Sequence, residues 1–320
     1  MRLSPLAVAL GLASCASPVA PGDPLERLGD EISVCGRLFH TGTPVVLWND
    51  PGGYDAYRID RRFPEELSAA RREESGIGPR YGPVRGGLGA EMAERVHAGG
   101  WSLGDLREVV DQFVVHYDVC GTSRQCFKVL QDVRRLSVHF LLDVDGTIYQ
   151  TLDLKERAWH ATVANDRSVG VEIAHIGAYP SPDHPVFRTW YGLDDAGLRL
   201  VFPEWMTQTG IRTAGFTPRP RREARIAGTV HGQPYWQHDF TEEQYVALAR
   251  LAAALAKVLP RIRLDAPRDE DGRVRTDALT AEELAAYSGI LGHHHVTTRK
   301  TDPGPAFDWE RLLRDAKRLR

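Results

Sequence analysis

The chain is 320 residues long, carries a formal net charge of −3 at pH 7 and has 26% charged residues. This length allows a sizeable hydrophobic core, either in one decorated domain or in two. The charge balance is that of an ordinary soluble protein, and no basic patch stands out along the chain. Composition therefore gives no support for nucleic acid as a partner.

An apolar run of Leu and Ala follows Arg2 at the start of the chain. The run is too short to span a bilayer, which takes roughly 20 apolar residues, and it is typical of an export signal. It ends in LASC at residues 12–15, which resembles the bacterial lipobox. We therefore expect residues 1–15 to be a lipoprotein signal peptide, with Cys15 lipidated and anchored to a membrane face. The alternative is an ordinary cleaved signal peptide.

The next segment, residues 16–30, is rich in Pro, Gly and Ala, as a flexible tether would be. Ala16 stands where an aspartate would favour retention at the inner membrane, so we expect the chain at the periplasmic face of the outer membrane. Residues 31–100 form an N-terminal extension with strand-like runs at 31–40 and 43–48, and we assign it no role. Nothing in the sequence indicates more than a monomer.

Three cysteines follow Cys15 in the sequence. Exported proteins live where disulfides persist. Cys120 and Cys126 bracket the loop 121–125, which a disulfide would staple, and the alternative for this pair is two isolated buried thiols. Cys35 is left over.

Residues 101–320 show mixed helix and strand patterns. Strands are expected at 112–118 and 168–179 and on both sides of an Asp145-Gly146 turn; helices are expected at 102–110, 126–136, 241–259 and 309–319, with another opening at Thr280. Between them lies an insertion at about 181–240, aromatic, basic and irregular, which either packs as a long loop or covers a cleft. The order predicts an α/β (α+β) domain with a central mixed sheet flanked by helices.

The run His293-His294-His295 and Asp302, close together near the C-terminus, indicate metal chemistry. Catalytic zinc takes three protein ligands and leaves a position for water. His116 ends a predicted buried strand, where sites of such sheets form. Each of these residues alone is more often structural, so only their combination supports a metal site.

Five motifs in order carry a resemblance: HYD at 116–118, SVHFLLDVDGTIYQ, RAWHA, SVGVEI and GHHHVTTRKTDPGPAFDW. Over about residues 102–320 the chain resembles the zinc-dependent N-acetylmuramoyl-L-alanine amidases of type 2, which share their fold with peptidoglycan recognition proteins. The resemblance implies Zn²⁺ held by His116, His293 and Asp302. His294 and His295 stay open as alternatives to His293, because the three are adjacent.

The same resemblance implies the remaining roles. Glu172 matches the general base, and a glutamate inside an apolar strand is costly unless used or paired; its alternative is an ordinary salt bridge. Lys300 matches the cation beside the developing oxyanion. Substrate-binding residues fall on Trp159, His160, Tyr117 and Asn165, whereas His139 fits the core as well as the substrate cleft. The Cys120–Cys126 pair matches a disulfide found in recognition proteins.

The expected activity is peptidoglycan hydrolysis at the amide between the lactyl group of N-acetylmuramic acid and the L-alanine of the stem peptide, for cell-wall turnover or recycling. A chain of this fold that binds peptidoglycan or muropeptides without cutting them is the alternative. A third hypothesis is a zinc hydrolase that acts on another amide. It has the same mechanism as the amidase and differs from it only in the substrate pocket.

Overall fold

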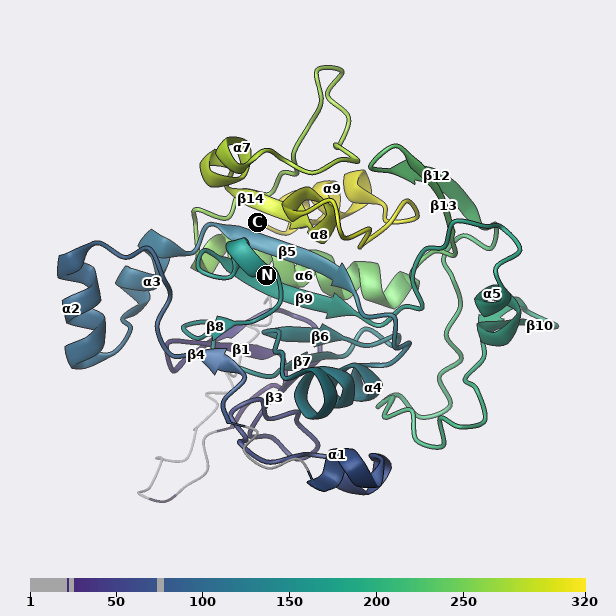
Figure 1. Cartoon of the computed structure of the whole chain (residues 1–320), viewed down its shortest axis with the longest axis horizontal. Helices are drawn as coiled ribbons and strands as arrows, with labels where there is room; N and C mark the ends of the chain where they lie inside the picture. The colour runs from purple at the N-terminus through teal and green to yellow at the C-terminus, as the bar shows by residue number, and fades with distance from the viewer. Residues whose placement is uncertain (1–21, 23–25, 74–77) are drawn as a thin grey trace, which may run out of the picture.

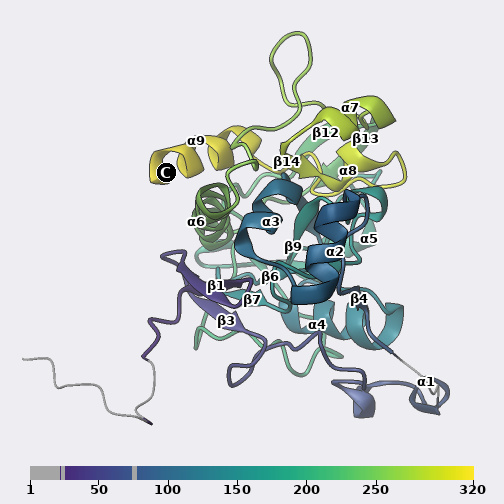
Figure 2. The same ribbon diagram turned by 90° about the vertical axis from the view of Figure 1, so that its left-hand side faces the viewer.

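A computed structural model of the chain describes residues 22, 26–73 and 78–320 and is organised around a mixed sheet (Figures 1 and 2). The sheet has six strands in the order β14-β5-β9-β6-β7-β3. Strands β14, β5, β9 and β6 are mutually parallel, β7 is antiparallel to β6, and β3 is parallel to β7. The strands span Gly289–Gly292, Gln112–Tyr117, Ser168–Ile173, Phe140–Leu142, Ile148–Gln150 and Val45–Leu47, in that order. The predicted mixed α/β fold is confirmed.

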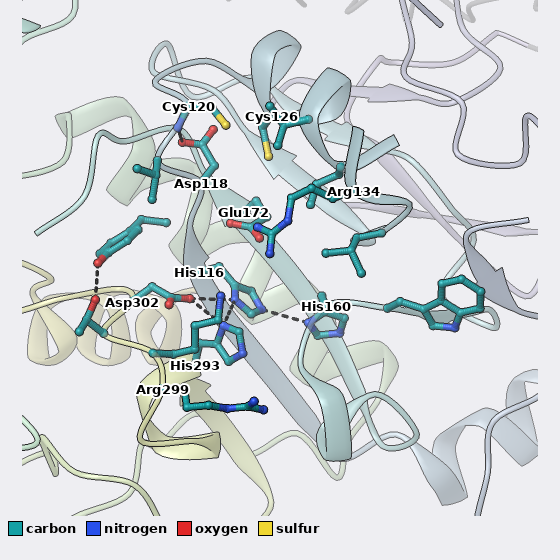
Figure 3. A pocket seen from close by; sticks show the side chains of 18 residues that line it. His116, Asp118, Cys120, Cys126, Arg134, His160, Glu172, His293, Arg299 and Asp302 are labelled. Atoms are coloured by element: carbon teal, nitrogen blue, oxygen red, sulfur yellow. Dashed lines mark hydrogen bonds and ion pairs between the residues drawn. The ribbon is translucent and has the colours of Figure 1, made fainter. Parts of the chain in front are cut away.

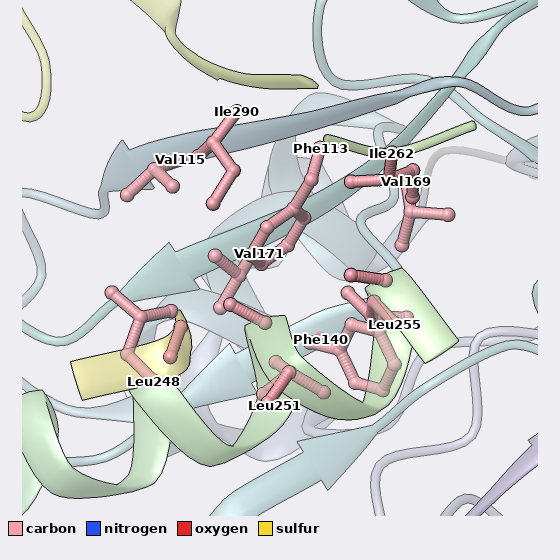
Figure 4. Packing of buried hydrophobic residues seen from close by; sticks show 14 of the residues in the cluster. Phe113, Val115, Phe140, Val169, Val171, Leu248, Leu251, Leu255, Ile262 and Ile290 are labelled. Carbon is pink, nitrogen blue, oxygen red and sulfur yellow. The ribbon is translucent and has the colours of Figure 1, made fainter. Parts of the chain in front are cut away.

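The main hydrophobic core lies between one face of this sheet and helix α6, Glu242–Val258 (Figure 4). Because side chains alternate along a strand, Phe113 and Val115 of β5 point to this face, as do Val169 and Val171 of β9. Helix α9, Trp309–Leu319, packs against α6. All four strand side chains are 0% exposed, and burial of each contributes roughly 1.5–3 kcal/mol.

The helix starts expected near residues 102, 241 and 280 are present, whereas the helix expected at 126–136 begins earlier, at Ser123. Helix α6 begins at a capping box of Thr241 and Gln244, and helix α7, Ala281–Ala286, begins at one of Thr280 and Glu283. Helix α3, Leu103–Val109, is capped by Ser102. The remaining helical elements near the sheet are α4, Ser123–Phe127, the π-helical η2, Lys128–Arg134, and the short α8, His293–Val296.

The N-terminal extension is part of the same body as the sheet. β3 forms the sheet edge, and β1, Glu31–Val34, pairs with β2, Arg37–His40. Further along are η1, α1, β4 and α2, at Pro64–Glu66, Ala69–Glu73, Tyr81–Gly82 and Ala90–Gly99. The buried Arg85 donates to the backbone carbonyls of Leu154, Glu156, Asn165 and Ser168. The extension therefore ties down the loop between β7 and β9, which includes β8, Arg157–Ala158, and η3, Thr162–Ala164.

The insertion at 181–240 is more regular than its sequence indicated. It contains helix α5, Pro185–Trp190, and two antiparallel hairpins: β10–β11, at Tyr191–Asp194 and Gly197–Leu200, and β12–β13, at Ile226–Val230 and Gln233–Gln237. Phe187 and Trp190 belong to a small separate core there. The prediction of an irregular loop was wrong, because short strands joined through turn residues such as Gly232 (φ +72°) lack the long apolar alternation that marks a strand.

The predicted signal peptide with Cys15, and most of the tether, lie outside the described residues. Among the residues that are described, no helix has the length and apolar character needed to cross a membrane.

Candidate active site

The carboxyl ends of three neighbouring parallel strands place the predicted ligands and base together. His116 is the penultimate residue of β5, and Glu172 lies directly beside it on β9 in the strand register. Residues in register on parallel strands point to the same face, so both side chains leave the sheet on the side opposite α6. His293 follows β14 immediately, as the first residue of α8. The edge formed by the carboxyl ends of parallel strands is where such folds build sites.

Three ligand atoms converge at this edge (Figure 3). Nδ1 of His116 lies 2.9 Å from Nδ1 of His293 and 2.9 Å from Oδ2 of Asp302, and the latter two atoms are 3.0 Å apart. All three side chains are buried. Burial lowers the pKa of His116 to about 4, which keeps its imidazole neutral. Burial alone would raise the pKa of Asp302, but His293 and His116 hold it below its usual value.

This donor set fits a zinc ion. Two imidazole nitrogens and a carboxylate oxygen point toward one position. The two rings can supply at most two protons for the three contacts between these atoms, so hydrogen bonds cannot satisfy all three contacts. A cation satisfies all three lone pairs at once, and two His with one acidic oxygen is a ligand set that catalytic zinc uses. The other nitrogen of His116, Nε2, lies 3.0 Å from Nδ1 of His160. In the tautomer with its proton on Nε2, His116 would donate to His160 and leave the lone pair of its Nδ1 for a metal. Such an outer partner fixes the tautomer of a metal-ligating histidine.

The three adjacent histidines have different surroundings. Of the three, only His293 has a ring nitrogen beside His116 and the carboxylate of Asp302. His295 accepts a hydrogen bond from the backbone of Gly292 (2.9 Å) and donates to the carbonyl of Arg275 (2.8 Å). His294 donates from Nδ1 to the carbonyl of Asp302 (3.0 Å). His293 therefore lies with His116 and Asp302, whereas His294 and His295 stabilise the surrounding loop through hydrogen bonds to its backbone.

Glu172 faces a cavity of about 260 Å³ that the three candidate ligands also line. Its Oε2 is buried without a hydrogen-bond partner. Burial raises the pKa of Glu172 well above its usual value, with further contributions from the Asp302 and Asp118 carboxylates, whereas Lys300 opposes the shift. A bound cation would likewise favour the charged form. Lys300 lines the same cavity, as expected for its predicted role.

The four predicted substrate-binding residues have different contacts. Trp159 lines the cavity. Tyr117 also lines it, with its hydroxyl 2.5 Å from Oγ1 of Thr301. His160 contacts the candidate ligand His116, and Asn165 accepts hydrogen bonds from the backbone of His160 (3.1 Å) and Ala161. Asn165 thus shapes the loop that carries His160.

Two cavity-lining arginines were absent from the sequence-based set. Arg134, at the end of η2, and Arg299 line the cavity together with Lys300. Arg299 had a signal, since it adjoins Lys300 in sequence. Arg134 had none, because it is far from the other candidate residues in sequence, although its side chain lies beside Glu172 (Figure 3).

The predicted Cys120–Cys126 disulfide is not formed in this structure, which has both residues as free thiols. Their sulfurs and an Asp118 oxygen lie within 4.8 Å of one another on the cavity wall. Cys126 is buried, and burial raises the pKa of its thiol well above the usual value, which keeps the thiol protonated. The short sequence separation of Cys120 and Cys126 correctly indicated that the two thiols lie close together, but not whether they form a disulfide.

Comparison with known proteins identifies the class to which this fold and site belong. The profile of the family Amidase_2, N-acetylmuramoyl-L-alanine amidase, matches residues 106–305. The matched range contains His116, Glu172, His293, Lys300 and Asp302. The chain belongs to this family.

The individual relatives found have low sequence identity to this chain. The chain is 24% identical over 184 residues to the 1,6-anhydro-N-acetylmuramyl-L-alanine amidase AmpD of Haemophilus influenzae, covering 57% of this chain and 60% of the relative's length. Among solved structures it is similar to a selenomethionine derivative of AmpD (TM-score 0.32, 21% identity, 65% of this chain and 86% of that one). It is also similar to the amidase AmiD from E. coli in complex with an anhydro-muramoyl tripeptide (TM-score 0.36, 18% identity, 64% and 57%). These structural likenesses are too weak to support an argument about the site.

Proposed function

We propose that this protein is a zinc-dependent peptidoglycan amidase, which hydrolyses the amide between the lactyl group of N-acetylmuramic acid and the L-alanine of the stem peptide. The observation that carries the proposal is the convergence of His116, His293 and Asp302 within 3.0 Å on a cavity that also holds Glu172 and Lys300, in a chain of this amidase family.

The residues of the chain divide the chemistry among them. His116, His293 and Asp302 would hold Zn²⁺, which would supply Lewis acidity to polarise a carbonyl and lower the pKa of water toward about 7. Glu172 presents an unpartnered oxygen to the cavity, takes the proton of the attacking water and returns it to the nitrogen of the leaving L-alanine. The ammonium of Lys300 stabilises the negative charge that develops on the amide oxygen. Trp159 provides an aromatic wall for the substrate.

The alternative is a protein of the same family that binds peptidoglycan or muropeptides without cutting them. A binder has no use for a complete set of ligands, base and cation, and here none of these residue types is missing. The geometry therefore favours catalysis.

The deciding experiment measures zinc content and release of stem peptide on the same purified sample. Both intact peptidoglycan and an anhydro-muramoyl peptide should be offered, because the curated relative carries the anhydro form in its name. Stoichiometric zinc, with peptide release that a chelator stops and zinc restores, is the expected result. Zinc without release from either substrate would contradict the amidase. Peptidoglycan binding without zinc or release would establish the binder.

The proposal places the mature protein, as a monomer, at the periplasmic face of the outer membrane, anchored through Cys15. Cys15→Ser should move the protein from the membrane fraction to the soluble fraction without changing peptide release. Retention of that variant in the membrane fraction would refute the anchor, and sedimentation of the solubilised protein as a dimer would refute the monomer.

A further inference from the structure

The turn that carries Lys300 and Asp302 is held from outside the sheet by a hairpin of the insertion, β12–β13. Residues 300–306 contain no helix or strand. Within the C-terminal segment, His294 holds the carbonyl of Asp302 through its backbone N–H and its ring, and the N–H of Lys300 donates to the carbonyl of Thr297 at 3.3 Å. Other backbone groups of the turn find partners elsewhere in the fold. In Figure 1 the hairpin lies beside the C-terminal segment that contains α8 and α9.

The first contact is at the tip of the hairpin. Nε2 of His231 donates to the backbone carbonyl of Lys300 at 2.8 Å, and the backbone N–H of His231 donates to the carbonyl of Thr276, also at 2.8 Å. The turn residue His231 is thereby held in place and fixes the peptide from which the Lys300 side chain leaves toward the cavity.

The second contact is at the other end of β13. Gln237 is 0% exposed, and both ends of its amide bind the turn just after Asp302. Its Nε2 donates to the carbonyl of Pro303 and its Oε1 accepts from the backbone N–H of Ala306, each at 3.0 Å. Gly304 leaves room for this amide, since a Cβ there would lie 2.3 Å from Oε1 of Gln237.

The hairpin backbone also packs directly on the turn. A Cβ at Gly228 of β12 would lie 2.6 Å from the Cβ of Pro305, so strand and turn are in close contact. The insertion adds Arg222, which donates to the carbonyl of Ala306 and pairs with Asp239. Together these contacts hold residues 300–306 on the side that faces the insertion. The candidate ligand Asp302 and Lys300 line the cavity.

We propose that the β12–β13 hairpin is a positioning element of the active site, with His231 positioning Lys300 and Gln237 positioning Asp302. The inference deepens the proposed amidase and rests on it for the role of Lys300. Neither residue touches substrate or metal; each acts through the turn. Lys300 is not a metal ligand, so loss of the His231 contact should act on turnover. Loss of the Gln237 contact beside Asp302 should act on zinc affinity, for which outer partners of metal ligands are worth about 10–100-fold.

The test compares four variants of the full chain. His231→Ala removes the donor to Lys300, whereas His231→Gln keeps an N–H at a similar reach. Both replace a residue with φ +52°, so the backbone cost is common to them. Gln237→Ala removes the clamp after Asp302. Gln233→Ala, at the exposed start of the same strand, is the matched control.

We expect His231→Ala to lower kcat by about 10–100-fold, the cost of a small displacement of a catalytic group, with the zinc Kd and the KM little changed, and His231→Gln to recover most of the loss. Gln237→Ala should raise the zinc Kd about 10–100-fold, and Gln233→Ala should change nothing. In both His231→Ala and Gln237→Ala, hydrogen exchange of residues 297–306 should quicken while that of α6 stays as in the parent. If Gln237→Ala does not fold, the two His231 variants still decide the matter.

Unchanged exchange in residues 297–306, with unchanged kcat and zinc Kd, would overturn the inference. Equal losses in His231→Ala and His231→Gln would overturn the role of the donor. A parent protein without amidase activity, but with the expected changes in exchange and zinc Kd, would refute the proposed function and leave the positioning of the turn standing.

Discussion

Two groups of buried histidines in this molecule differ in what surrounds their ring nitrogens. In His139, His175 and His295, each ring has one backbone N–H to accept from and one backbone carbonyl to donate to. Such a pair of partners satisfies a neutral imidazole completely. In His116 and His293, by contrast, the Nδ1 atoms face each other and the Asp302 carboxylate. These rings have too few protons to make a hydrogen bond in every one of the three contacts.

The difference separates a ligand from a structural residue more reliably than burial does. Both groups are buried, and burial lowers the pKa of His116 to about 4 and that of His139 to about 3. Only the convergent group leaves lone pairs aimed at a common point, which is the arrangement that a cation completes.

The largest effect is expected within the histidine run itself. His293→Ala should abolish stoichiometric zinc binding and peptide release, because it removes one of three ligands. His295→Gln should keep zinc while lowering Tm, because its partners are backbone groups of Gly292 and Arg275. Zinc content by metal analysis and Tm by circular dichroism check the pair. If His295→Gln lost zinc and His293→Ala kept it, the contrast between the two groups would be reversed.

Glu172→Gln keeps the shape of the side chain and removes its basicity. Zinc binding should remain, while kcat for peptide release falls by about 10²–10⁴-fold, the usual contribution of a general base. Single-turnover kinetics on a zinc-loaded sample separates this loss from a change in substrate binding. Parent-like turnover in this variant would eliminate Glu172 as the base.

Lys300→Met keeps much of the length of the side chain and removes its charge. Because a fixed charge beside the oxyanion acts in the transition state rather than the ground state, kcat should fall about 10²-fold with KM little changed. A rise in KM at constant kcat would instead make Lys300 a substrate-binding residue. Steady-state kinetics on an anhydro-muramoyl peptide distinguishes the two outcomes.

Local patterns predicted a large part of this molecule. The capping residues at Thr241 and Thr280 marked helix starts, and the Asp145-Gly146 turn marked the β6–β7 hairpin. The residue types themselves singled out His116, the run 293–295 and Asp302 as candidate metal ligands, and the family resemblance then favoured His293 within the run and supplied the role of Glu172.

What the sequence did not give depends on contacts between distant segments. The hairpin β12–β13 contacts residues 300–306 through Gln237, some 69 positions away from Ala306, and no local pattern encodes that pairing. The role of Asn165 was equally hidden, since its carbonyl binds the backbone of the neighbouring loop rather than facing solvent. The irregular appearance of 181–240 has the same origin, because its hairpins are stabilised by packing more than by propensity.

The smallest expected effect concerns a structural histidine and the acid stability of the fold. Burial, aided by Arg85, lowers the pKa of His139 to about 3, against about 6.5 in the unfolded chain. The unfolded state therefore binds the extra proton first, so the contribution to stability is complete above about pH 6.5 and is lost progressively as the pH falls toward 3. Each pH unit in that window costs about 1.4 kcal/mol.

His139→Gln should make the protein less stable at pH 7, because it disturbs the bonds to Gly170 and Glu156, yet it should lose less stability on acidification. Between pH 6.5 and 4.5 the loss in the parent should exceed that in the variant by about 2–3 kcal/mol. Urea denaturation of both proteins at the two pH values, under identical zinc conditions, measures this difference of differences, in which other titrating groups cancel. Equal losses would mean that His139 binds a proton as readily in the folded chain as in the unfolded one. That result would remove His139 from the satisfied group and weaken the contrast with His116 and His293.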